Sequence, residues 1–281
     1  MATLNFAKVS LLACPRCHSP LKFQNFTLFD MSTHKGLKKI LSKIFYARPS
    51  LSLNIAAKKN YSHLCKLLES KVQSIGLVIG CGEGGSGIEN LLRTHGLRLV
   101  FSDVRWTSGI NILCDGHQLP FCNESFDLVV IQGVLEHVFD YVRVADEVTR
   151  VLKDDGLIYC EFPFLQPNHG GAFDFTRLTY MGHRRLWRHF EQIDAGACGG
   201  PGMALAHMTK AFMRSLFRWK LWQKMADFIT DWTLWWLKCL DLKIAKTPAG
   251  LDSASGYYFI GRKVAYDLSD DELTKFYRGA Q

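Results

Sequence analysis

Short apolar runs that alternate with helical patterns limit the fold of this 281-residue sequence more than any other feature. The runs are SIGLVIG (74–80), LRLVFSD (97–103), FDLVVIQG (126–133) and GLIYCEF (156–162). Each has the length of one buried strand, and helical patterns cover residues 84–94, 140–153 and 178–190. This alternation predicts an α/β protein with a doubly wound, mostly parallel sheet that is covered on both faces. Ligands of such sheets bind at the carboxyl ends of the strands.

A glycine-rich turn follows the first run. Gly80, Gly82 and Gly84 stand where side chains would keep a ligand away from the backbone amides, so a small ligand is expected there. Taken as letters, Gly80, Gly82 and Gly85 also match the dinucleotide pattern G-x-G-x-x-G. Asp103 lies 21 residues beyond Gly82, at the end of the second run, where a carboxylate can accept both hydroxyls of a ribose. NAD and S-adenosylmethionine both satisfy these features.

Residues 114–141, CDGHQLPFCNESFDLVVIQGVLEHVFDY, separate the two cofactors. They resemble class I S-adenosylmethionine-dependent methyltransferases of the type 11 group: an Asp precedes LPF, FD opens the next strand, and LEHV follows it. The resemblance extends over residues 74–164. It implies the seven-stranded, Rossmann-like architecture of that family, methyl transfer as the activity, and S-adenosylmethionine as the cofactor.

The same resemblance assigns the cofactor residues. The methionine part would face Gly80, Cys81, Gly82 and Gly84, the ribose Asp103, the adenine Asp115 and Gly116, and the sulfonium Gln132. Val78 stands where many members carry an acid, so a hydrogen bond that braces the turn is expected to be missing. The alternative is a glycine-rich turn with incidental acids at the surface.

The acceptor's chemistry decides which further residues are needed. An alcohol is a poor nucleophile near neutral pH and gains from a general base, whereas an amine or a phenol needs less help. His137, His169 and Glu136 are candidate bases, and His137 has a structural role as its alternative. The fourth strand is not followed by the N-P-P-Y run that resembling enzymes use for nucleobase amines, which argues against nucleic acid as the partner.

The stretch FPFLQPNHGGAFDFTRLT (162–179) sets His169, Asp174 and Arg177 around a glycine pair, after the last run. It resembles the H-x-x-P-x-D-[YF]-x-R-[FL]-T loop of methyltransferases of bacterial surface-polysaccharide and glycolipid synthesis, with Ala172 in place of Pro. In that reading Asp174 orients His169 as the base and Arg177 binds a phosphate or carboxylate of the substrate. In the alternative, Asp174 and Arg177 pair with each other and His169 is solvated.

Residues 216–242 contain five of the seven tryptophans and are expected to form one amphipathic helix. Its polar face would mix Lys and Asp, and its apolar face would carry the tryptophans. The apolar face would lie on an anionic membrane surface, on the domain, or on a partner's copy. The basic segment 34–50 is a second amphipathic candidate, and the net charge of +8 favours anionic partners.

The N-terminal CPRC motif is half of a zinc ribbon, and since no second pair follows, no metal site is expected. The nine cysteines are scattered, which predicts a reducing, cytoplasmic location, at or near the inner membrane face if a lipid carries the acceptor. The predicted units are an N-terminal segment (1–57), the methyltransferase core (58–202), a tryptophan-rich helical insertion (203–250), and a final strand with a loose polar tail (251–281).

The sequence thus predicts a methyltransferase that O-methylates a sugar or glycolipid hydroxyl. Two alternatives stay open: methylation of a quinone-like lipid phenol, and a non-catalytic scaffold that binds the cofactor. The acceptor is expected to be a small or lipid-linked molecule, and the sequence does not set the oligomeric state.

Overall fold

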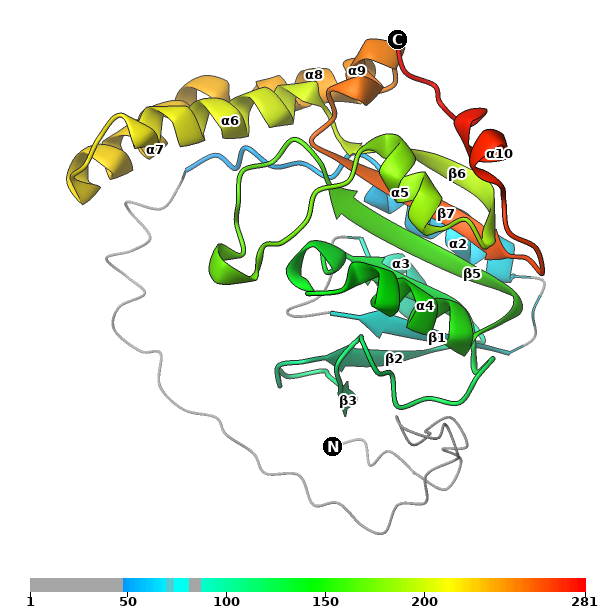
Figure 1. The fold of residues 1–281 in the computed structure, drawn as a ribbon. Coiled ribbons are helices and arrows are strands. Elements are labelled where there is room, and N and C mark those ends of the chain that lie inside the picture. Colours follow the sequence, from blue (N-terminus) through cyan, green and yellow to red (C-terminus); the bar gives the residue numbers. More distant parts are fainter. Residues whose placement is uncertain (1–47, 70, 72, 81–86) are drawn as a thin grey trace.

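The computed structural model describes residues 48–69, 71, 73–80 and 87–281 (Figure 1). Its strands are β1 Ser74–Ile79, β2 Leu97–Asp103, β3 Ile112–Leu113, β4 Phe126–Gln132, β5 Leu152–Pro163, β6 Phe190–Gly199 and β7 Gly256–Lys263. Its α-helices are α2 Ala57–Leu68, α3 Glu89–Leu92, α4 Tyr141–Val151, α5 Tyr180–Leu186, α6 Pro201–Ser215, α7 Lys220–Leu234, α8 Leu237–Ile244, α9 Pro248–Asp252 and α10 Asp270–Thr274. Two 3-10 turns are η2 Leu135–His137 and η3 Gly171–Phe173.

All seven strands form one sheet in the order β3-β2-β1-β4-β5-β7-β6. The strands from β3 to β5 pair in parallel, and β7 runs antiparallel to both β5 and β6. This arrangement confirms the predicted fold class, a doubly wound, mostly parallel sheet of the class I methyltransferase type. The four apolar runs become β1, β2, β4 and β5. The residues of β1, β4 and β5 are mostly buried because both faces of the sheet are covered there, whereas those of β2, nearer the edge of the sheet, are mostly half-buried.

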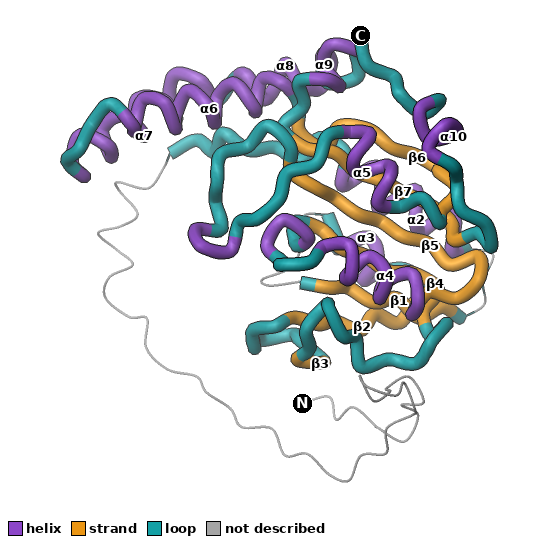
Figure 2. The backbone as a smooth tube through the Cα atoms, viewed as in Figure 1, coloured by secondary structure: helices purple, strands orange, loops and turns teal. Residues whose placement is uncertain are grey.

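Each face of the sheet has its own hydrophobic core (Figure 2). One core joins the sheet to α4 and α5 and includes the fully buried Trp187. The other joins the sheet to α2 through Tyr61 and Leu64. The packed helices on both faces leave the carboxyl edge of the parallel strands for a ligand.

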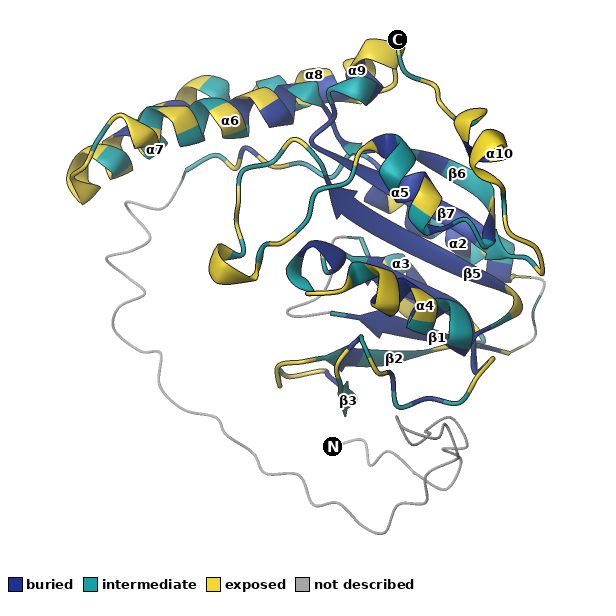
Figure 3. Ribbon diagram, viewed as in Figure 1, coloured by how far each residue is buried: buried dark blue, intermediate teal, exposed yellow. Residues whose placement is uncertain are grey.

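The tryptophan-rich region differs from the prediction. Two helices, α7 and α8, replace the single helix expected over residues 216–242, and together with α6 they extend away from the sheet as a helical arm (Figure 1). We call residues 201–244 the arm. Its buried side chains are mostly small or polar, whereas all five of its tryptophans are exposed. Figure 3 shows exposed residues along much of the arm. The prediction failed because small residues let two helices pack closely, and a helical-wheel pattern does not show which side they use.

The C-terminal tail also differs from the loose segment that was expected. Residues 270–274 form α10, which begins with a capping box between Ser269 and Glu272. Leu273 of this helix is buried, and the Arg184 guanidinium lies over the ring of Phe276. The tail is therefore part of the packed domain at this point.

None of the helices in the described part of the chain combines the length and the apolar character needed to cross a bilayer.

Candidate functional site

Four strands deliver the predicted cofactor residues to one edge of the sheet. Gly80 follows β1, Asp103 ends β2, Asp115 comes after β3, and Gln132 ends β4. Because β1 to β4 are parallel neighbours, their carboxyl ends lie side by side. Three further predicted residues, Cys81, Gly82 and Gly84, lie outside the described residues.

The backbone conformation and the close packing at position 80 both require glycine. Its φ is +67°, and a Cβ atom there would lie 2.2 Å from Cγ2 of Val134. Gly116 is buried, and a Cβ atom there would lie 3.3 Å from Cγ1 of Val144. Both glycines therefore permit close packing at the edge.

The two predicted acids of the edge are held by local contacts. One oxygen of Asp103 accepts a hydrogen bond from the backbone N–H of Arg105 at 2.9 Å. One oxygen of Asp115 accepts from the backbone N–H of His117 at 2.9 Å and contacts its Nδ1 at 2.6 Å. Although burial acts against it, these bonds lower the pKa of Asp115. Local hydrogen bonds thus orient both carboxylates, and the lowered pKa keeps Asp115 ionised near neutral pH.

A buried carboxylate that the sequence analysis missed lies beneath this edge. Glu161, near the end of β5, accepts hydrogen bonds from Asn54 Nδ2 (2.8 and 2.9 Å), Gln132 Nε2 (2.7 Å) and the Tyr159 hydroxyl. Burial raises the pKa of Glu161, and the three donors oppose that rise. Gln132, which also accepts from the Tyr61 hydroxyl at 3.3 Å, is thereby fixed. A single acid inside the apolar run 156–162 was the available signal.

A hollow of about 180 Å³ opens between these groups and the loop that follows β5. The residues that line the hollow come from the strand ends, η2 and the loop after β5: Gln132, Gly133, Glu136, Glu161, Phe162, Pro163, Gln166 and Cys198. The structure thus places the end of β4, the end of β5 and η2 around one space.

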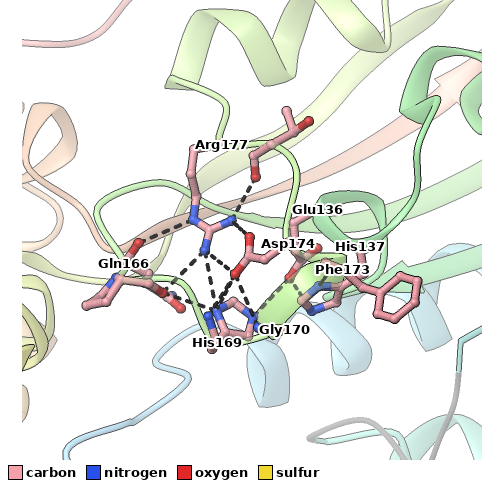
Figure 4. Close-up of polar contacts among 10 residues, drawn as sticks. Glu136, His137, Gln166, His169, Gly170, Phe173, Asp174 and Arg177 are labelled. Atoms are coloured by element: carbon pink, nitrogen blue, oxygen red, sulfur yellow. Dashed lines mark hydrogen bonds and ion pairs between the residues drawn. The ribbon is translucent and has the colours of Figure 1, made fainter.

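The loop after β5 is held by an internal ion pair. The Asp174 carboxylate, 1% exposed, accepts from both terminal nitrogens of Arg177 and from the backbone N–H groups of His169 (2.7 Å) and Gly170 (3.3 Å) (Figure 4). The Arg177 guanidinium lowers the pKa of Asp174 strongly. Arg177 also donates to the backbone carbonyls of Gln166 and Thr176. Its donors are therefore used within the loop, as in the Asp174–Arg177 pair of the alternative interpretation, and the contact of Arg177 with substrate stays a prediction.

Two imidazoles converge on the carboxylate of Glu136. Nε2 of His137 and Nε2 of His169 each lie 3.7 Å from Glu136 Oε1, and the two rings meet edge to face at 4.9 Å (Figure 4). We call Glu136, His137 and His169 the Glu136 cluster. The Glu136 side chain is 3% exposed, whereas that of His169 is 45% exposed. The carboxylate raises the pKa of His169, against the effect of burial.

The far side of each imidazole is also contacted. His137 Nδ1 donates to the carbonyl of Phe173 at 2.7 Å. His169 Nδ1 faces Asp174 Oδ2 at 3.6 Å, the carbonyl of Pro167 at 3.4 Å and Arg177 Nη2 at 3.4 Å. The loop therefore brings His169 to His137, two predicted site residues that lie 32 positions apart in the sequence.

The methyltransferase-domain family model matches residues 77–160 of this chain. This segment is thus similar to a methyltransferase domain, and it begins within β1 and ends within β5. Glu136 and His137 lie inside the matched segment, and His169 lies beyond it.

Curated relatives match over part of their length. A ubiquinone/menaquinone biosynthesis C-methyltransferase of Desulfotalea psychrophila is 26% identical over 152 residues, which are 47% of this chain and 60% of the relative. A demethylmenaquinone methyltransferase of Geobacillus stearothermophilus is 36% identical over 76 residues, 27% of this chain and 31% of the relative. The chain thus spans less than two thirds of either relative.

Among solved structures, the chain is similar to a 1,6-didemethyltoxoflavin-N1-methyltransferase of Burkholderia thailandensis with bound S-adenosylhomocysteine. The identity is 14%, the TM-score 0.46, and the similarity covers 75% of this chain and 80% of that one.

Proposed function

We propose that this chain is an S-adenosylmethionine-dependent methyltransferase. Support comes from the methyltransferase-domain match and from the carboxyl edge, where Gly80, Asp103, Asp115 and Gln132 lie on neighbouring strand ends. S-adenosylmethionine carries its own leaving group, so the protein's main tasks are to align the acceptor and exclude water. The ends of β4 and β5 supply a fixed floor for that alignment through Gln132 and Glu161.

We propose further that the acceptor is a hydroxyl. One observation supports this step: the partly exposed imidazole of His169 lies beside the Glu136 carboxylate, which lines the hollow at the ends of β4 and β5. A carboxylate that favours the protonated imidazole makes it a stronger base for a hydroxyl proton. A sugar or glycolipid as the bearer of that hydroxyl rests on the loop resemblance alone.

Calorimetric titration tests the cofactor. S-adenosylhomocysteine is expected to bind saturably and NAD not at all, and Asp103→Ala should weaken the binding by about 10-fold, since a charged hydrogen bond contributes roughly 1.5–3 kcal/mol. Asp146→Ala, which removes an acid from α4, is the matched control. Binding of neither ligand would support the scaffold alternative.

A lipid phenol is the second candidate acceptor. The curated relatives are named for methylation in quinone biosynthesis, which favours it. The candidates respond differently to His169→Ala: methylation of an alcohol should fall by roughly 10²-fold or more, whereas a phenol needs less help from a base. Retained turnover of the true acceptor would contradict the sugar-hydroxyl proposal.

For a lipid-linked acceptor, we propose that the arm rests on an anionic membrane surface. The predicted polar face mixes Lys and Asp, but in the structure the three acids of the arm are buried or paired within it. Asp231 pairs with Lys210 at 2.6 Å, Asp227 with Arg214 at 3.5 Å, and Asp241 is buried. The arm's exposed charges are basic: Arg214, Arg218, Lys220, Lys224 and Lys243. Trp219, 74% exposed, and Trp222 stand among them.

Vesicle sedimentation tests this contact. The full chain is expected to bind phosphatidylglycerol vesicles at low salt and phosphatidylcholine vesicles weakly. Reversing two charges with Lys220→Glu and Lys224→Glu should lower binding at least about 10-fold, because each basic residue near such a surface contributes about 1 kcal/mol. Trp219→Ser should also weaken it, while Trp106→Ser, an exposed tryptophan outside the arm, should not. Equal binding to both lipids would contradict the anionic surface.

A further inference from the structure

We propose that Glu136, His137 and His169 bind a divalent transition-metal cation of the zinc type. The inference goes beyond methyl transfer, and only its consequence for the acceptor rests on the proposed function. One ligand atom from each of the three residues lies within 4.8 Å of the other two, and Nε2 of each histidine is 3.7 Å from Glu136 Oε1. Two imidazoles and one carboxylate form a ligand set typical of zinc and related ions.

The spacing fits a cation better than direct hydrogen bonds. Both nitrogens lie 3.7 Å from Glu136 Oε1, which is beyond the range of a hydrogen bond. Two ligands that each bind zinc at about 2.1 Å are separated by at most about 4.2 Å. A cation between these atoms therefore explains why the two imidazole nitrogens and the carboxylate oxygen point toward one another without forming hydrogen bonds.

The carboxylate itself supplies a second observation. Glu136 Oε2 is buried and has no hydrogen-bond partner among the described residues. A buried carboxylate oxygen without a partner is costly, because the lost hydration is not replaced. A bound cation compensates that cost directly.

The outer contacts of the imidazoles suit metal binding as well. The Phe173 carbonyl accepts from His137 Nδ1, which leaves the lone pair of Nε2 free. At His169, two acceptors face Nδ1, the Asp174 carboxylate and the Pro167 carbonyl, and they favour a proton there, whereas the Arg177 Nη2 donor faces the same nitrogen at 3.4 Å. Such contacts on the second nitrogen are usual for metal-binding histidines, and they orient the ring.

Gly170 permits this arrangement. A Cβ atom at this position would lie 2.5 Å from Nδ1 of His137 and 2.8 Å from the Phe173 carbonyl that holds it. Close packing against His137, a proposed ligand, thus explains why the first residue of the glycine pair in the loop is a glycine. A side chain there would displace the His137 ring.

A cation held by three protein groups keeps coordination positions for another ligand. In the proposed methyltransferase, a hydroxyl oxygen of the acceptor would take such a position, and the cation would lower the pKa of that hydroxyl so that its proton passes to solvent water. The oxygen would then attack the methyl group, and S-adenosylhomocysteine would leave. Under this inference His169 serves as a metal ligand, and the cation carries the activation that a free imidazole base would otherwise supply.

The test is direct titration of the chelator-treated full chain with Zn²⁺, in a Cys14→Ser, Cys17→Ser background that removes the N-terminal thiolates. One equivalent is expected to bind. His169→Ala, His137→Ala and Glu136→Gln should each weaken binding at least 10-fold, and Gly170→Ala should weaken it with all ligands present. His95→Ala, an exposed histidine outside the cluster, is the matched control.

Cobalt(II) gives an independent readout. The expected spectrum has d–d bands of nitrogen and oxygen ligands and no thiolate charge-transfer band. The inference is overturned if no equivalent binds, or if binding is unchanged by His169→Ala and Glu136→Gln. S-adenosylhomocysteine binding, measured on the same variants, reports folding and tests the proposed function separately.

Discussion

Both the end of the sheet and the arm contain buried carboxylates with hydrogen-bond partners, but the apolar side chains are buried in the sheet and exposed in the arm. At the sheet, Glu161 is buried with three donors around it, and the apolar side chains of β4 and β5 are buried with it. In the arm, Asp231 and Asp241 are buried and paired, while Trp219 and its neighbours are exposed. Polar groups thus hold both regions together, but only the sheet has buried its apolar surface. The arm's outer face remains available for a partner.

The largest effect is expected at the sheet. Glu161→Ala leaves the Asn54, Gln132 and Tyr159 donors buried without their acceptor, which should cost roughly 3 kcal/mol or more in the free energy of unfolding. Chemical denaturation measures this change. Glu191→Ala, an exposed acid of β6, should change it by less than about 0.5 kcal/mol. Equal effects of the two variants would show that the buried network is not what separates the regions.

A smaller effect is expected inside the arm. Asp241, 1% exposed, accepts from the backbone N–H groups of Gly202 (2.7 Å) and Met203 (2.9 Å), so α8 supplies the N-terminal cap that α6 lacks. Asp241→Ala should cost about 1–2 kcal/mol.

Amide hydrogen exchange locates this loss. Exchange should become faster in α6 and stay unchanged in β4 and β5, and Asp241→Asn, which keeps one acceptor oxygen, should have a milder effect. Faster exchange across the whole sheet would mean that arm and sheet unfold as one unit.

The smallest effect is expected on the arm's outer face. Phe212 is 62% exposed, so Phe212→Ser should change the free energy of unfolding by no more than about 0.5 kcal/mol. Thermal denaturation at two protein concentrations checks this. A large loss of stability that depends on protein concentration would instead show that copies of the chain cover one another's arms. The arm would then bury its apolar surface as the sheet does.

Much of the fold was predictable because the four apolar runs have a period and length that only buried strands satisfy. Gly80, Asp103 and Gln132 could be placed at one edge for the same reason, since parallel strands share their carboxyl ends. The sequence left two interpretations of Asp174 open, and the structure contains a contact of each: Asp174 pairs with Arg177 and also faces His169 Nδ1 at 3.6 Å.

What could not be predicted depends on residues far apart in the sequence. Asn54 and Glu161 are separated by 107 positions, and no local pattern links them. In the arm, the period of the tryptophans indicated an amphipathic pattern but did not say which face is packed, and the packed face carries the aspartates. The pattern treats aspartates as exposed, whereas a lysine partner or a helix N-terminus makes their burial favourable.

The position of β7 has a consequence for synthesis of the chain. The strand inserts between β5 and β6, yet it is made after both of them and after the entire arm. On the ribosome, β5 and β6 therefore wait with unpaired edges until residue 263 has left the exit tunnel. The nascent chain displays these edges and the aromatic arm at the same time, so this is the interval in which it is most exposed to aggregation.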